Sequence, residues 1–256
     1  GIRTIFNATD ELLLRTKELA DKYGVGVHMH IAEARSEVEY AKATRGCTTV
    51  THLNNLGFLD KNILAAHAVW LTNEEVPTCK GDGVKVSHNP ASAMRVLGFA
   101  KIPRMLREGV CVALGTDGTP TNNRMNMVDE MWVTSLIHKG WRLEPDVVKA
   151  QEILAMATIN GAEALGEKDL YGSLEEGKKA DLILIDPNLN ADMLPVHDPI
   201  ANLVTSMHST NITHTMCDGK WLMKDRHLLT LDEAAILKAG REHAEAICRR
   251  GGISLP

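Results

Sequence analysis

Four short apolar runs, each leading into a polar residue, are the feature that most constrains the fold of this chain. The polar residues are His30, His67, His88 and Asp117. Helical patterns separate or follow most of these runs, as over residues 36–44, 102–108 and 147–165. Alternation of strands and helices is typical of βαβ units, whose strands form a parallel sheet. The sequence therefore predicts an α/β fold.

The fourth run, over residues 110–117, also indicates how its strand faces its surroundings. Alternate side chains of a strand point to opposite faces. One face carries small residues and Asp117, while the other carries valine and leucine. This pattern suits a barrel strand with helices outside, and it turns Asp117 inward at the C-terminal end. We call the edge formed by these C-terminal strand ends the mouth, where (β/α)₈ barrels carry their reactive groups.

The pattern changes after Tyr171 from strand–helix units to strands that follow one another directly. Strands are expected from Asp181 and over residues 212–223, the second with an Asp-Gly turn signal. A helix is expected at the end of the chain, from about 231 to 249. The expected units are barrel strands with their helices over 1–168, a small β unit over 169–228, and a helix with a tail over 229–256.

Composition narrows the classes of partner. The net charge is −5 and the charges are interspersed, so we expect neither nucleic acid nor a membrane as partner. No apolar run reaches about 18 residues, and the five cysteines are scattered without a CxxC pair. We therefore expect a cytoplasmic protein with reduced thiols. The sequence leaves open whether the protein forms a homo-oligomer.

Histidines and carboxylates together form the chemically informative set. A lone histidine at a strand end is more often structural than a ligand. Here His30, Glu33, His67, His88 and Asp117 follow successive strands at intervals that fit βα units. Imidazole and carboxylate groups are typical ligands of zinc and iron. The ordered set thus favours a metal site at the mouth.

Four motifs resemble strands five to eight of the amidohydrolase superfamily. In this chain they are residues 28–33 (HMHIAE), 65–67 (AAH), 87–92 (SHNPAS) and 114–118 (LGTDG). The resemblance is to the deaminase and chlorohydrolase branch, and residues 172–181 are similar to its lead from barrel to β-sandwich. It implies the C-terminal half of a metal-dependent (β/α)₈ TIM barrel plus part of a small β-sandwich domain.

The resemblance also implies a role for each of the five residues. His30 and Asp117 would be metal ligands, with zinc preferred over iron. Glu33 would contact the substrate and carry a proton to its ring nitrogen, His67 would orient the attacking water, and His88 would contact the substrate. Glu33, His67 and Asp117 would be the catalytic residues. The implied substrate is a small molecule, and the implied reaction is hydrolytic deamination or dechlorination of a purine-like or triazine-like ring.

Two departures from the family pattern bear on these expectations. The first-strand His-x-His pair has no counterpart, because only two strand ends lie between His30 and Asp117. Ala93 follows Ser92 where many relatives carry asparagine, which affects the class of substrate. Two alternatives therefore stay open. The chain could be a truncated, non-catalytic remnant of such an enzyme, or a related hydrolase of cyclic amides.

Overall fold

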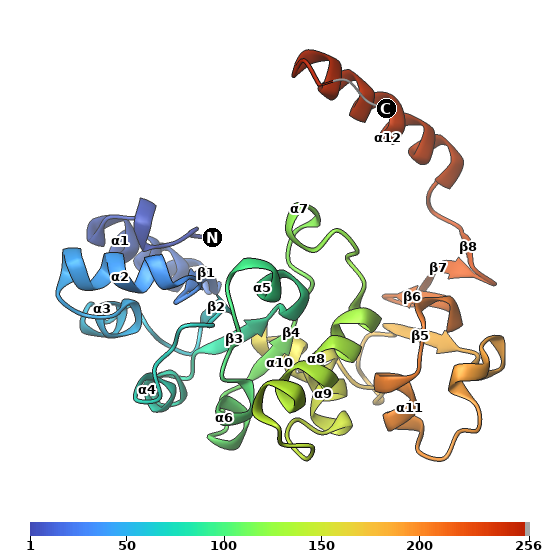
Figure 1. Cartoon of the computed structure of the whole chain (residues 1–256), viewed down its shortest axis with the longest axis horizontal. Helices are drawn as coiled ribbons and strands as arrows, with labels where there is room; N and C mark the ends of the chain where they lie inside the picture. The colour runs from blue at the N-terminus through green and yellow to red at the C-terminus, as the bar shows by residue number, and fades with distance from the viewer. Residues whose placement is uncertain (254–256) are drawn as a thin grey trace.

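A computed structural model describes residues 1–253, which contain two four-stranded sheets (Figure 1). The first sheet is parallel, and its strands lie side by side in chain order. They are β1 (Val27–Ile31), β2 (Ile63–His67), β3 (Lys85–His88) and β4 (Val112–Leu114). The predicted order of parallel neighbours is confirmed, and the fold is α/β.

The parallel sheet has a buried face and a more open face. On β1, Val27, Met29 and Ile31 are at most 3% exposed, whereas His28 is exposed and His30 is half-buried. The register pairs His30 with Ala66, which continues the open face onto β2. Because alternate residues of a strand share a face, the strand pattern sorts apolar side chains toward the helices and His30 away from them.

Helices precede, connect and follow the strands of the parallel sheet. They are α1 (Asp10–Tyr23), α2 (Arg35–Arg45), α3 (Thr49–Asn55), α4 (Glu75–Asp82), α5 (Pro90–Val96), α6 (Ile102–Arg107), α7 (Thr119–Asn122) and α8 (Met127–Arg142). Thr9 caps the start of α1, since its side chain accepts a hydrogen bond from the backbone N–H of Leu12. Gly24 ends α1 in the left-handed conformation that glycine adopts without strain.

The prediction of one helix over 147–165 is wrong in one respect, because the structure has two helices there. These are α9 (Ala150–Ala157) and α10 (Ile159–Ala164), separated by Thr158 at φ −132° and ψ −98°. The hydroxyl of Thr158 donates to the carbonyl of Leu154. Just beyond the break, the amide of Asn160 donates to the carbonyl of Val112 on β4 at 3.0 Å. The break therefore lets α10 satisfy a backbone group of the sheet.

The second sheet is separate from the first, as predicted, and its strands are antiparallel. Its strands are β5 (Leu182–Ile185), β6 (Ile212–Cys217), β7 (Lys220–Lys224) and β8 (His227–Leu228). Asp218 and Gly219, both at positive φ, form the turn between β6 and β7 that their sequence indicated. Between β5 and β6 lies α11 (Pro199–Thr205), with the short 3-10 helices η2 (Pro187–Leu189), η3 (Ala191–Met193) and η4 (Ser209–Asn211); η1 (Ile5–Asn7) precedes α1.

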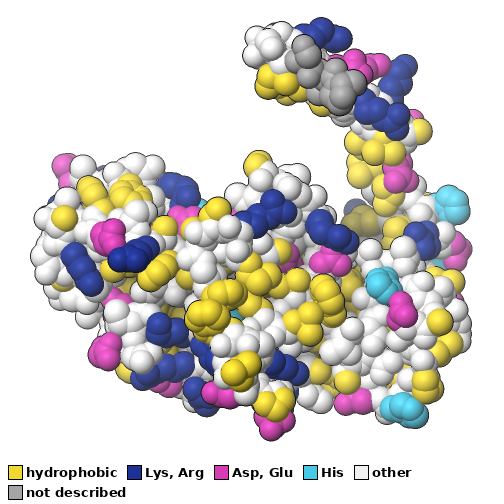
Figure 2. Space-filling model, in the orientation of Figure 1, with side chains coloured by type: hydrophobic (Ala, Val, Ile, Leu, Met, Phe, Trp, Pro, Cys, Tyr) yellow, Lys and Arg dark blue, Asp and Glu magenta, His cyan; other side chains and the backbone are white. Residues whose placement is uncertain are grey.

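The last helix, α12 (Glu233–Arg250), extends away from both sheets (Figure 1). Its apolar residues Ile236, Leu237 and Ile247 are exposed, and apolar side chains are visible along it in Figure 2. Within residues 1–253, neither this helix nor any other combines the length and the hydropathy needed to cross a membrane.

Candidate active site

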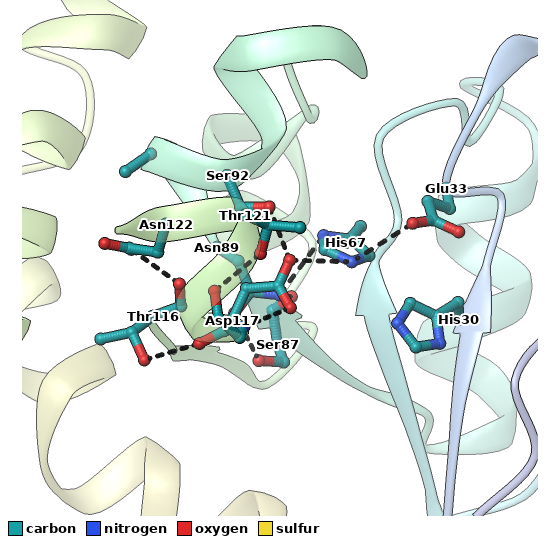
Figure 3. Close-up of polar contacts among 12 residues, drawn as sticks. His30, Glu33, His67, Ser87, Asn89, Ser92, Thr116, Asp117, Thr121 and Asn122 are labelled. Atoms are coloured by element: carbon teal, nitrogen blue, oxygen red, sulfur yellow. Dashed lines mark hydrogen bonds and ion pairs between the residues drawn. The ribbon is translucent and has the colours of Figure 1, made fainter. Parts of the chain in front are cut away.

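Four of the five residues singled out in the sequence converge at the mouth (Figure 3). The rings of His30 and His67 lie 5.2 Å apart between centroids. Nε2 of His67 is 3.7 Å from Oε1 of Glu33 and 3.8 Å from Oδ2 of Asp117. His67 is thus the centre of a cluster that joins residues from the ends of β1, β2 and β4.

Left-handed backbone at non-glycine residues marks the cluster. The φ angles are +50° at Ala32, +72° at His67, +50° at Ala68 and +62° at Asp117. In a regular strand His67 would face the same way as Ile31, its register partner, which lies on the buried face. The left-handed conformation ends the strand and turns the imidazole toward the mouth. Such conformations cost on the order of 1–3 kcal/mol each and cluster at functional sites.

His30 is oriented by the segment that precedes η1. Residues 2–3 run alongside β1, and the backbone carbonyl of Arg3 accepts a hydrogen bond from Nδ1 of His30 at 2.8 Å. With the proton on Nδ1, Nε2 of His30 keeps a free lone pair. Histidines that bind metals usually donate their other ring N–H to a carbonyl or carboxylate in this way. The arrangement of His30 therefore fits a metal ligand.

His67 is arranged differently. Its Nδ1 accepts from the side-chain amide of Asn89 at 3.4 Å, and the same amide nitrogen donates to the carbonyl of Ser87. The neutral ring then carries its proton on Nε2, which faces the carboxylates. Burial lowers the pKa of His67, although Glu33 and Asp117 oppose this effect. His67 is therefore set up as a neutral hydrogen-bond donor toward the middle of the cluster.

Asp117 is held as a carboxylate by two donors. Oδ2 accepts from the hydroxyl of Ser92 at 2.5 Å, and Oδ1 accepts from the backbone N–H of Gly118 at 2.6 Å. Burial alone would raise the pKa of Asp117. The hydrogen bonds from Ser92 and Gly118 and the nearby His67 outweigh burial, so the pKa is lowered.

Glu33 lies over the cluster and is bonded to Arg3. The guanidinium donates twice, from Nη1 to Oε2 at 2.8 Å and from Nη2 to Oε1 at 3.1 Å. The pair raises the pKa of Arg3, chiefly through the hydrogen bond to Glu33. Within residues 1–253, His30, Glu33 and His67 form a group whose ligand atoms all lie within 4.8 Å of one another. Asp117 borders that group, so imidazole and carboxylate donors suitable for zinc or iron surround one point.

The structure does not bring His88 to this cluster. Its side chain is 2% exposed and lies on the helix-covered face, with Nε2 3.2 Å from Nε2 of His138 on α8. Burial lowers the pKa of both rings, that of His138 to about 4. One neutral ring donates to the other, so the pair ties α8 to β3.

Sequence reasoning missed three residues that contact the cluster. Asn89 and Ser92 lie inside the motif at 87–92, whose polar side chains were the available signal. Arg3 gave no signal, because it meets Glu33 from 30 positions away.

Comparisons with known proteins give consistent matches over most of the chain. The model of the "Amidohydrolase family" matches residues 2–222. A 5'-deoxyadenosine deaminase of Methanobrevibacter smithii is 39% identical over 249 residues, which are 96% of this chain and 57% of the relative. A 5-methylthioadenosine/S-adenosylhomocysteine deaminase of Aquifex aeolicus is 40% identical over 243 residues, 94% of this chain and 56% of the relative.

A solved structure is also similar to this chain in fold and sequence. The adenosine deaminase from Xanthomonas campestris, which has bound zinc, superposes with a TM-score of 0.92 at 31% identity, covering 96% of this chain and 56% of its own. The chain thus spans little more than half the length of the proteins that it matches.

Proposed function

The chain belongs to the amidohydrolase family, and on that basis we propose that the protein is a metal-dependent hydrolase that deaminates a purine nucleoside of the adenosine class. The observation that carries the proposal is the convergence of His30, Glu33, His67 and Asp117 at the mouth. Both relatives and the solved structure described above are named as deaminases of adenosine derivatives, which favours deamination over dechlorination.

The metal would be held by Nε2 of His30 and by the carboxylate of Asp117. Zinc is the preferred ion, because the similar adenosine deaminase has bound zinc, while iron uses the same ligand types. When bound, the metal supplies a Lewis acid that lowers the pKa of water from about 15.7 to about 7.

Each side chain of the cluster then has a defined task. Asp117, whose pKa is lowered, accepts the proton of the attacking water. His67 donates from Nε2 and orients that water toward the ring carbon that carries the amino group. Glu33 carries that proton to the ring nitrogen. It then carries the second proton of the same water, which is left on the oxygen added to the ring carbon, to the amino group as the carbon–nitrogen bond breaks and ammonia leaves. Arg3 holds the carboxylate of Glu33 over the substrate position.

The fold fits the same proposal. We infer that β1–β4 and their helices, within residues 1–168, are the C-terminal half of a (β/α)₈ barrel. Four parallel neighbours with one helix-covered face and reactive groups at one edge are what such a half would contain. The sheet β5–β8 would belong to the small β-sandwich domain over 169–228, followed by the helix and tail over 229–256.

The test is a substrate screen on the full-length protein loaded with zinc. Adenosine, 5'-deoxyadenosine, guanine, a chlorinated triazine and a cyclic amide are compared for release of ammonia or chloride and for ring opening. We expect ammonia from the two 6-aminopurine nucleosides, and loss of activity after a chelator has removed the metal. Chloride release from the triazine alone, ring opening of the cyclic amide alone, or no turnover at all would contradict the proposal.

A further inference from the structure

A buried carboxylate lies directly behind the segment that carries Glu33. Glu37, in the first turn of α2, is 0% exposed. One of its oxygens accepts from the backbone N–H of Ala32 at 2.8 Å, and the other accepts from the backbone N–H of Glu33 at 2.9 Å. Both oxygens of Glu37 are therefore engaged by the two residues that follow β1.

These two bonds fall on a strained turn. Ala32 has φ +50°, a left-handed conformation that residues other than glycine rarely adopt. The N-cap of α2, Ala34, has no side chain that could accept from backbone N–H groups near the helix start. The carboxylate of Glu37 instead reaches back beyond the N-cap to the N–H groups of Ala32 and Glu33, and it thereby fixes the direction in which the chain leaves β1.

Burying a carboxylate is unfavourable unless hydrogen bonds compensate for its lost hydration. Burial accordingly raises the pKa of Glu37, while the N–H groups of Glu33 and Ala32 oppose the rise. An apolar side chain would fill this position at lower cost, so the carboxylate indicates that the geometry of the turn matters. Glu37 holds the backbone of Glu33, and the side chain of Glu33 reaches over the cluster.

Glu75 offers an internal comparison. It lies in the first turn of α4, is 6% exposed, and accepts from the backbone N–H of Thr72 and from the hydroxyl of Thr48. A buried glutamate in the first turn of a helix thus also holds the loop after β2. Neither of the residues that Glu75 contacts belongs to the cluster.

We propose that Glu37 is a positioning residue for Glu33: its two backbone hydrogen bonds hold the turn at Ala32 that directs the carboxylate of Glu33 toward His67 and the substrate. The proposal rests on the function proposed above for Glu33. Because Glu37 is buried and its two hydrogen bonds to this turn go to backbone groups, it acts on the reaction through the position of Glu33 and does not contact the substrate.

The test compares Glu37→Gln with Glu75→Gln in the full-length, zinc-loaded protein. Glutamine keeps the shape of glutamate, but its NH₂ group faces a backbone N–H and cannot accept from it. Misplacing a reacting group by about 1 Å can cost about 10²-fold, so Glu37→Gln should lower kcat by about 10- to 100-fold. Zinc stoichiometry and KM should stay close to those of the parent protein. Glu75→Gln makes the same chemical change at another buried helix start and should leave kcat nearly unchanged, because its oxygen can accept from Thr72 while its NH₂ group donates to the hydroxyl of Thr48.

Amide hydrogen exchange tests whether Glu37 holds this turn, and the measurement does not require catalytic activity. In Glu37→Gln, the N–H groups of Ala32 and Glu33 should lose about tenfold or more of their protection, because each loses an ionised acceptor. Glu37→Asp keeps the charge, shortens the side chain by one methylene group, and serves if Glu37→Gln does not fold. It should lower kcat with little change in Tm.

Equal losses of kcat in Glu37→Gln and Glu75→Gln would overturn the proposal, because the effect would then be a general one on the fold. A parental kcat in Glu37→Gln would overturn it as well. If the parent protein releases no ammonia from any substrate, the function proposed above fails. The exchange experiment then decides the inference alone, and unchanged protection of Ala32 and Glu33 in Glu37→Gln would refute it.

Discussion

Replacing Glu33 by glutamine separates proton transfer from metal binding. Glutamine has nearly the same size and keeps one oxygen for Arg3, but it cannot carry a proton. General acid–base groups contribute about 10²–10⁴-fold to a rate, so kcat should fall by about that factor. At about 1.36 kcal/mol per tenfold, the activation free energy rises by roughly 2.7–5.4 kcal/mol. The zinc content should not change if Glu33 is a proton shuttle.

The structure indicates that unfolding cannot account for a loss of this size. The main contact that Glu33→Gln weakens is the ion pair with Arg3, whose side chain is 50% exposed while that of Glu33 is 15% exposed. Exposed ion pairs contribute about 0–1 kcal/mol to stability, and glutamine keeps one of the two hydrogen bonds. The free energy of unfolding should therefore fall by less than about 1 kcal/mol, well below the change in activation free energy.

The assay measures kcat from ammonia release at saturating nucleoside, and zinc by elemental analysis of the same samples. Glu39→Gln is the matched control, because Glu39 on α2 pairs with Arg35 at 2.8 Å on an exposed surface. It makes the same chemical change away from the cluster and should alter neither kcat nor zinc content. If Glu33→Gln loses zinc in proportion to its activity, Glu33 is a metal ligand and the reasoning about its role is refuted.

Three further outcomes follow from the structure. His30→Ala should remove zinc from the full-length protein, since Nε2 of that ring is the free imidazole nitrogen, and full zinc stoichiometry would contradict the assignment. Gly115→Ala should lower kcat and also stability, the latter by about 1–3 kcal/mol, because an added Cβ would lie 2.5 Å from Oδ1 of Asn89. Gly140→Ala, whose added Cβ would meet nothing within 4 Å, is its control, and equal kcat in the two variants would contradict the argument. Burial lowers the pKa of His138 from 6.5 to about 4, so the unfolded chain binds the extra proton first and stability is lost as pH falls from 6.5 toward 4. The free energy of unfolding, measured with urea, should fall between about pH 7 and about pH 5. This fall should be larger by on the order of 2 kcal/mol in the parent than in His138→Gln, and equal falls would refute the attribution to His138.

The parallel sheet and part of its mouth could be predicted because they depend on local patterns. Alternation along β1 sorts Met29 from His30, and the register then aligns His30 with the open face of the next strand. The direction of the His67 side chain could not be predicted from alternation. Alternation alone groups it with Ile31 on the buried face, and it reaches the cluster only through left-handed backbone that its residue type does not signal.

The helix α8 escaped the sequence analysis for a physical reason. It buries the polar residues Glu130, Thr134 and His138, while Trp132 and Leu136 are about half exposed. An apolar period therefore does not mark its buried face. The position of His88 depends on this same helix, since its ring is packed against α8. Arg3 and Glu37 act through contacts with the backbone or with distant side chains, which no spacing rule describes.

The central claim is that His30 and Asp117 hold a metal at the mouth while Glu33 and His67 serve the reaction beside it. Anomalous scattering at the zinc edge, from crystals of the full-length protein, locates the metal directly. The account predicts a peak about 2.0–2.2 Å from Nε2 of His30 and from a carboxylate oxygen of Asp117, with Glu33 outside that distance. A peak bonded to Glu33 and not to Asp117, or no peak at this mouth, would contradict it.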